Sequence, residues 1–168
     1  KEAYLRILDE QPEFPKRAEV LYGYGWAALR LNEYDNAIES FRLLLDRYPD
    51  SPLAPDAAFR IGDAYFATGS FSQAVSAYRD MIDSYPRADQ AAKAAYQIAQ
   101  SYFRLEDFTL AAGAYDRVIN SYPKSEFYDD ALNMKGASLL GRKASRKPSR
   151  CSGSFPLIPI SPTMRFTR

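Results

Sequence analysis

The chain has 168 residues, 46% of them hydrophobic and 26% charged, a composition typical of one soluble globular domain. It contains no His and a single Cys, Cys151, which excludes a Cys/His zinc site, a histidine-based catalytic triad and an internal disulfide. No run approaches the roughly 18 apolar residues of a membrane-spanning helix. The chain starts at Lys1 without Met, so the sequence is silent about a targeting segment.

The net charge of +1 conceals two regions of opposite sign. Residues 143–168 carry six basic side chains and no acidic one, which leaves 16 basic and 21 acidic side chains, a net charge of −5, in residues 1–142. Because the body is acidic, we expect no nucleic-acid partner. The last 26 residues contain four prolines and no helical period. They are predicted to be a disordered basic tail rich in Pro and Ser, or a segment that is not native to the protein.

A repeat of 37 residues organises the body. The dipeptide Tyr-Pro occurs at 48–49, 85–86 and 122–123. A fixed period of this length indicates stacked helical units, so the predicted fold is all-α, a solenoid of antiparallel helix hairpins. Further positions recur with the same step, and they are aromatic (Tyr4, Phe41, Tyr78, Tyr115), small (Ala37, Ala74, Ala111), aliphatic (Leu8, Leu45, Ile82, Ile119) or small again (Gly25, Gly62, Ala99, Gly136).

In chain order, residues 1–12 are predicted to be the second helix of a partial unit. Three complete units follow at about 15–51, 52–88 and 89–125, and the first helix of a fourth at 126–141. Each complete unit is predicted to contain two helices, because apolar residues recur at spacings of three and four.

The second unit illustrates the pattern. Apolar and small residues from Ala58 to Tyr65 predict one helix, residues 68–70 a break, and the stripe from Phe71 to Tyr85 a second helix that Pro86 ends. The small residues are predicted to leave room for aromatic rings, as Gly62 would for Tyr78.

The helix starts have their own predicted signals. Ser51 is expected to be an N-cap and Pro52 the first helical residue. Asp89 is expected to cap the corresponding helix of the third unit, and Ser125 followed by Glu126 to start that of the fourth.

The unit resembles the tetratricopeptide repeat (TPR). With Pro55 as the first position, seven residues occupy the characteristic places of that family. Such a resemblance implies a right-handed superhelix of helix hairpins that binds proteins and is not an enzyme. The sequence differs from the family in its period, which is 37 residues in place of 34. It also has Ala58 and Ala95 where a large residue is usual, Ala99 in place of Gly, and Lys135 in an apolar position. The matching residues are Ala58, Ile61, Gly62, Tyr65, Ala74, Tyr78 and Pro86.

Segments such as YPDSPLAPDAAFRIGDAYFATGSFSQAVSAYRDMIDSYP are similar to TPR units of bacterial cell-envelope proteins. The first resemblance is to the periplasmic TPR protein of the Tol-Pal system, and the second to an outer-membrane assembly lipoprotein. These resemblances imply a periplasmic or outer-membrane-associated scaffold in envelope maintenance or cell division. The cytoplasm also contains TPR proteins, so both compartments stay open.

The resemblance also implies a groove lined by the first helix of each unit. It is largely aromatic, as suits a peptide or partner protein laid in a groove. Packing between neighbouring helices is the alternative role of these rings. The chaperone-type carboxylate clamp, which uses Asn and Lys at set groove positions, is not expected, because the ninth positions of the four first helices are Trp26, Asp63, Gln100 and Ala137. The predicted groove residues are Tyr22, Trp26, Arg30, Phe59, Asp63, Phe66, Tyr96, Gln100, Phe103 and Arg104.

The function predicted from the sequence is a non-catalytic protein-interaction scaffold without cofactor or metal. Adjacent acids such as Asp129 and Asp130 are typical of helix starts, so no catalytic residue is assigned. Two alternatives stay open: a regulatory or targeting region of a larger enzyme, or a structural oligomerisation segment. Apolar residues of the last helix, such as Leu132 and Leu140, favour self-association.

Overall fold

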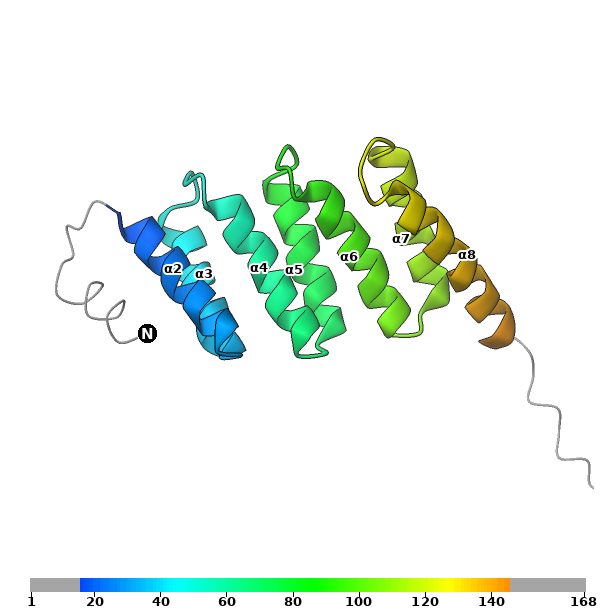
Figure 1. The fold of residues 1–168 in the computed structure, drawn as a ribbon, viewed down its shortest axis with the longest axis horizontal. Helices are drawn as coiled ribbons and strands as arrows, with labels where there is room; N and C mark the ends of the chain where they lie inside the picture. Colours follow the sequence, from blue (N-terminus) through cyan, green and yellow to red (C-terminus); the bar gives the residue numbers. More distant parts are fainter. Residues whose placement is uncertain (1–15, 146–168) are drawn as a thin grey trace, which may run out of the picture.

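A computed structural model of the protein describes residues 16–145, which form α-helices joined by short turns (Figure 1). No β-strand occurs between these limits. The predicted partial unit at 1–12 and most of the predicted tail lie outside the described residues. The helices are α2 (Arg17–Arg30), α3 (Tyr34–Arg47), α4 (Ala54–Ala67), α5 (Phe71–Ser84), α6 (Ala91–Arg104), α7 (Phe108–Ser121) and α8 (Tyr128–Ser145).

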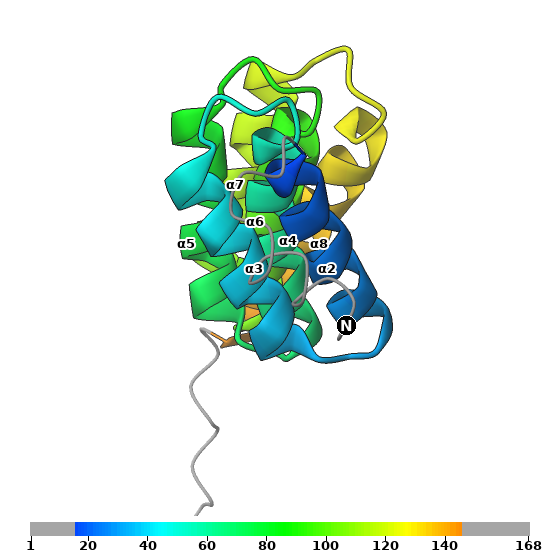
Figure 2. The same cartoon turned by 90° about the vertical axis from the view of Figure 1, so that its left-hand side faces the viewer.

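The helices pack in sequence order as hairpins, α2 with α3, α4 with α5, and α6 with α7, and α8 packs on α7. The first helices, α2, α4, α6 and α8, form one layer, and the second helices, α3, α5 and α7, form the other (Figures 1 and 2). The prediction of an all-α solenoid of antiparallel hairpins is confirmed.

Each hairpin buries an aromatic ring against a small residue of its first helix. The side chains of Phe41, Tyr78 and Tyr115 are fully buried. A Cβ atom added to Gly62 would lie 2.4 Å from the Tyr78 ring, and one added to Gly25 would lie 2.6 Å from Phe41. Real Cβ atoms do not approach carbon so closely, so glycine lets the two helices of a hairpin close around the ring.

The turn inside each hairpin uses one residue with a left-handed backbone. Asn32, Gly69 and Glu106, each 37 residues apart, have φ values of 59°, 75° and 59°. After Gly69, the backbone N–H of Ser70 donates to the Tyr65 carbonyl at 2.9 Å, which satisfies an orphan carbonyl at the end of α4.

The joint between hairpins corrects the predicted helix starts. The N–H of Ser51 donates to the Tyr48 carbonyl at 3.0 Å and that of Ala54 to the Ser51 carbonyl at 2.9 Å, so two consecutive turns follow Tyr-Pro. Helix α4 therefore begins at Ala54, and Pro52 lies in a turn. The Ser51 hydroxyl accepts from the Leu53 N–H at 3.2 Å and caps this turn, not the helix.

The same pair of turns recurs in the next two joints. Helix α6 begins at Ala91 with Gln90, not Asp89, at the N-cap position. Helix α8 begins at Tyr128, not 126, after a turn closed by Ser125. The caps predicted from a single favourable side chain are wrong here, because the residues between Tyr-Pro and the next helix form hydrogen-bonded backbone turns and the helix starts only after them.

Candidate functional site

The predicted groove residues lie on three helices of the first layer. Arg30 and Arg104 are exposed, and most of the others are half-buried. Phe59 is the exception with 1% of its surface exposed, so its ring offers almost no surface to a partner. Helix α2 carries Tyr22, Trp26 and Arg30, α4 carries Phe59, Asp63 and Phe66, and α6 carries Tyr96, Gln100, Phe103 and Arg104.

A chain of hydrogen bonds joins the first two helices of this layer. The Trp26 Nε1–H donates to the Tyr22 hydroxyl at 2.6 Å, and that hydroxyl donates to Oδ2 of Asp56 on α4. The Gln90 side chain, at the start of α6, donates to Asp56 Oδ1 at 3.3 Å. One carboxylate therefore connects three consecutive first helices.

Arg60 lies at the centre of the cluster. Its Nε donates to Asp56 at 3.2 Å, and its guanidinium donates to Asp63 Oδ2 at 2.9 Å. The guanidinium carbon also lies 4.7 Å from the centre of the Trp26 ring, a cation–π distance. The Tyr78 hydroxyl from α5 donates to Asp63 Oδ1 at 2.7 Å. Charged groups and rings are thus held in one arrangement. We refer to Tyr22, Trp26, Asp56, Arg60 and Asp63 as the α2–α4 cluster.

Burial changes the proton affinity of this cluster. It raises the pKa of Asp63, although the hydrogen bond from Tyr78 and the charge of Arg60 partly oppose the rise. It also raises the pKa of Tyr78, and the nearby Asp63 carboxylate adds to that effect. Burial lowers the pKa of Arg60, but Asp56 and Asp63 together more than offset this, so the net shift is upward.

The remaining predicted rings pack within and between hairpins. Tyr96 stacks on Phe127 with ring centres 5.3 Å apart. The Gln100 Nε2 donates to the Tyr96 hydroxyl at 2.8 Å. Phe66 and Phe103 each make an edge contact with the first residue of the following helix, Phe71 and Phe108, with ring centres 5.3 and 5.4 Å apart. Each of these rings therefore packs against another aromatic ring of the protein, and part of its surface stays exposed.

Four residues near this site were not predicted from the sequence: Asp56, Arg60, Gln90 and Lys93. Asp56, Arg60 and Asp63 follow the i, i+4 and i+3 spacing that brings side chains together on a helix, a signal readable in the sequence. Lys93 lies with its Nζ 5.1 Å from the centre of the Phe59 ring, and only the fold brings the two together.

Two classes of site receive no support between residues 16 and 145. Within this range no three His, Cys, Asp or Glu side chains are grouped so that they could hold a metal ion. None of the helices that the structure describes combines the length and apolar character needed to cross a bilayer.

Two family models match the chain. The model of YfiO, outer membrane lipoprotein, matches residues 53–151, and a tetratricopeptide repeat model matches residues 1–52. The sequence has no match among curated proteins. The longer match is to an outer membrane lipoprotein, the second of the two envelope resemblances seen in the sequence.

Solved TPR structures share the fold. The Sgt2 TPR domain from Aspergillus fumigatus matches with a TM-score of 0.61 and 19% identity, over 89% of this chain and 91% of that one. A TPR protein from Parabacteroides merdae matches with a TM-score of 0.66 and 16% identity, over 86% of this chain and 54% of that one. The first TPR of Spaghetti (RPAP3), bound to the HSP90 peptide SRMEEVD, matches with a TM-score of 0.58 and 22% identity, over 75% of this chain and 95% of that one.

Proposed function

The chain belongs to the YfiO family of outer membrane lipoproteins, and we propose that it is a non-catalytic scaffold that binds a peptide or partner protein along the layer formed by α2, α4 and α6. The observation that carries this proposal is the α2–α4 cluster. Its side chains are fixed by one another before any partner arrives, which reduces the entropy lost on binding.

The partly exposed residues around the cluster suit a protein partner. Trp26 combines a large ring with a fixed orientation, and Trp is enriched among the residues that dominate binding energy. Arg30 and Arg104 are exposed and form no ion pair within residues 16–145, so both are available to carboxylates of a partner. A TPR domain of the same fold is bound to the peptide SRMEEVD, which supports peptide binding as a function of this fold.

Family membership supports a location at the outer membrane and a role in envelope maintenance. A role in the Tol-Pal system or in cell division stays a prediction from resemblance. Self-association is a lesser part of the proposal, supported by the exposed side chains of Leu132 (44%) and Leu140 (69%) on α8.

The proposed groove is tested by capture of partners from an envelope extract. Immobilised wild type is compared with a double variant, Trp26→Ala with Phe66→Ala, and with Leu43→Ala, which shortens an exposed leucine on the opposite layer. We expect the double variant to lose at least about tenfold of the bound partner, because two large contact surfaces are removed. Leu43→Ala should retain it.

Circular dichroism melts establish that both variants are folded before capture. If a folded double variant retains the same partners in the same amounts, the groove is not the binding surface and the proposal is overturned.

A further inference from the structure

Two hollows open through the layer of second helices, away from the α2–α4 cluster. The α5–α7 hollow, of about 480 Å³, has α5 and α7 as walls and Ala95, Ile98 and Tyr102 of α6 as its floor. The α3–α5 hollow, of about 710 Å³, has α3 and α5 as walls and the residues 37 positions earlier as its floor. The hollow is therefore a repeated product of the architecture.

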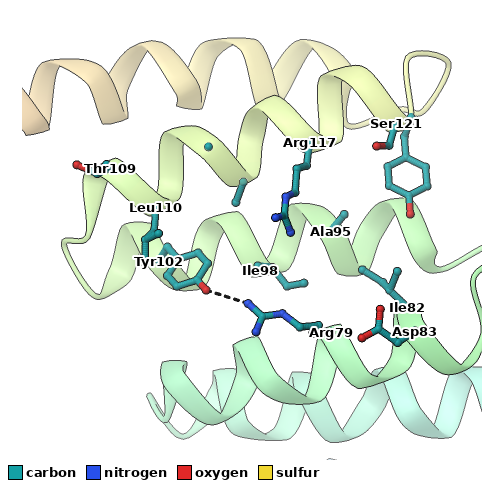
Figure 3. Close-up of a pocket in the computed structure, with 13 residues that line it drawn as sticks. Arg79, Ile82, Asp83, Ala95, Ile98, Tyr102, Thr109, Leu110, Arg117 and Ser121 are labelled. Carbon is teal, nitrogen blue, oxygen red and sulfur yellow. Dashed lines mark hydrogen bonds between the residues drawn. The ribbon is translucent and has the colours of Figure 1, made fainter.

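A hydrogen bond from wall to floor recurs in both hollows. Arg42 donates to the Tyr65 hydroxyl at 2.8 Å in the α3–α5 hollow, and Arg79 donates to the Tyr102 hydroxyl at 3.1 Å in the α5–α7 hollow (Figure 3). Each arginine therefore borders an apolar floor at a fixed place. The guanidinium keeps further N–H groups for another acceptor, because it has five and this contact uses one.

The two hollows differ in charge and in one apolar residue. At one wall position the α3–α5 hollow has Asp80 and the α5–α7 hollow has Arg117, and at another Gln73 is replaced by Leu110, whose side chain is 49% exposed. The α5–α7 hollow thus contains two guanidinium groups, from opposite walls, against one carboxylate, that of Asp83 (Figure 3). In the α3–α5 hollow one arginine faces one aspartate.

Arg117 is a charged wall residue of this hollow that makes no polar contact with the other described residues. It is exposed and forms no hydrogen bond or ion pair with any residue from 16 to 145, and Figure 3 shows it reaching from α7 over the floor residues Ala95 and Ile98. A guanidinium beside an apolar floor favours a ligand that places a carboxylate next to an apolar group.

The length of the hollow favours a peptide. Its α7 wall extends from Thr109 to Ser121, about 18 Å at the rise of an α-helix, which corresponds to about five residues of extended peptide. Hydroxyl groups at both ends of this wall suit a peptide backbone, which brings its own donors and acceptors.

We propose that the α5–α7 hollow is a second binding site, for a short acidic and apolar segment of a partner protein. An aspartate or glutamate of the segment pairs with Arg117, and a neighbouring leucine or phenylalanine packs on Ile98 and Leu110. The α3–α5 hollow does not take this segment, since Asp80 repels the carboxylate and Gln73 replaces the apolar contact. The site lies on the layer opposite the proposed groove and is independent of it.

The test uses the blocked peptide acetyl-Leu-Glu-Phe-Leu-Gly-amide and its Gln counterpart, titrated into the ¹⁵N-labelled full chain and followed by NMR. With wild type, we expect the Glu peptide to shift amide signals between Ala95 and Tyr102 and between Leu110 and Arg117. The Gln peptide should bind about tenfold more weakly, as should the Glu peptide to Arg117→Asp, because a charge-assisted pair is lost.

The α3–α5 hollow provides a gain-of-function control. Asp80→Arg with Gln73→Leu reproduces the other hollow there, so the Glu peptide should acquire a second site, with new shifts between Ala58 and Tyr65. All changed side chains lie on the surface, and a melt of each variant checks its fold.

Three results would overturn the proposal: equal shifts in both hollows of wild type, unchanged affinity for Arg117→Asp, or equal binding of the Glu and Gln peptides. Displacement of the Glu peptide by equimolar decanoate would likewise overturn it, because the site would then be one for a fatty acid.

Discussion

The hairpins α4/α5 and α6/α7 are related by 37 residues and bury the same aromatic ring, Tyr78 in one and Tyr115 in the other. The Tyr78 hydroxyl donates to Asp63. The residue equivalent to Asp63 is Gln100, whose amide donates to Tyr96 instead. The Tyr115 hydroxyl is buried and has no hydrogen-bond partner within residues 16–145.

The two hairpins share the buried ring and the small residue against it, but only α4 carries the charged residues of the α2–α4 cluster. Both hairpins need the ring, and both place a small residue against it, Gly62 or Ala99. The charged residues are not repeated: Asp56, Arg60 and Asp63 of α4 correspond in α6 to Lys93, Gln97 and Gln100. Because α6/α7 folds without this cluster, the α2–α4 cluster is dispensable for the architecture, which favours a functional role for it.

The largest expected effect on stability comes from enlarging the small residue that packs against the buried ring in both hairpins. Gly62→Leu should lower the free energy of unfolding by about 3 kcal/mol, because even a Cβ atom there would lie 2.4 Å from the Tyr78 ring. Ala99→Leu should have a comparable effect against Tyr115. Urea unfolding followed by circular dichroism measures both.

Gly136 is the matched control, since it occupies the same repeat position in α8 and a Cβ added there would have no heavy atom within 4 Å among the described residues. Gly136→Leu should leave stability unchanged or raise it by up to about 1 kcal/mol, the usual gain over glycine in a helix. Equal losses at 62 and 136 would show that helix geometry, and not the buried ring, explains the small residues.

The second prediction sharpens the difference between the hairpins. Tyr78→Phe should lower the free energy of unfolding by about 2 kcal/mol, because the half-buried Asp63 carboxylate loses a charge-assisted hydrogen bond. Tyr115→Phe should be neutral or stabilising by up to about 1 kcal/mol, since it removes a buried hydroxyl that has no partner. The two single variants, compared in urea at neutral pH, form the experiment. A larger loss for Tyr115→Phe than for Tyr78→Phe would contradict this account of both hydroxyls.

Most of the fold could be predicted from the sequence because its signals repeat. Tyr48, Tyr85 and Tyr122 are the C-cap residues of α3, α5 and α7, and the following prolines prevent the helices from continuing. The helix starts could not be predicted as well. Two backbone turns after each Tyr-Pro move the starts by one or two residues, and backbone hydrogen bonds of this kind carry no single-residue signal.

The candidate site was only partly predictable. Repeat positions placed Tyr22, Trp26 and Asp63 on the first helices, as the structure does. The contacts among them required the fold, because Tyr22 and Asp56 are 34 residues apart, as are Asp56 and Gln90. Lys135 is similar. It stands in an apolar repeat position, and its Nζ lies 2.6 Å from Asp116 Oδ1 on α7, a pairing that the helix period alone does not predict.

The smallest expected effect is the response of the two buried tyrosines to alkaline pH. Burial raises the pKa of both Tyr78 and Tyr115 above the ordinary value of 10.0. Above pH 10 the unfolded chain loses these protons while the folded chain keeps them, so stability falls as pH rises. Each tyrosine should account for about 1 kcal/mol of lost stability by pH 11. The difference in stability between Tyr115→Phe and wild type should therefore keep its neutral-pH value up to about pH 9 and grow in favour of the variant from pH 10 to 11. The measurement is the urea midpoint of wild type and of Tyr115→Phe across this pH range. Parallel curves of midpoint against pH would mean that the Tyr115 hydroxyl ionises as readily in the folded chain as in the unfolded one.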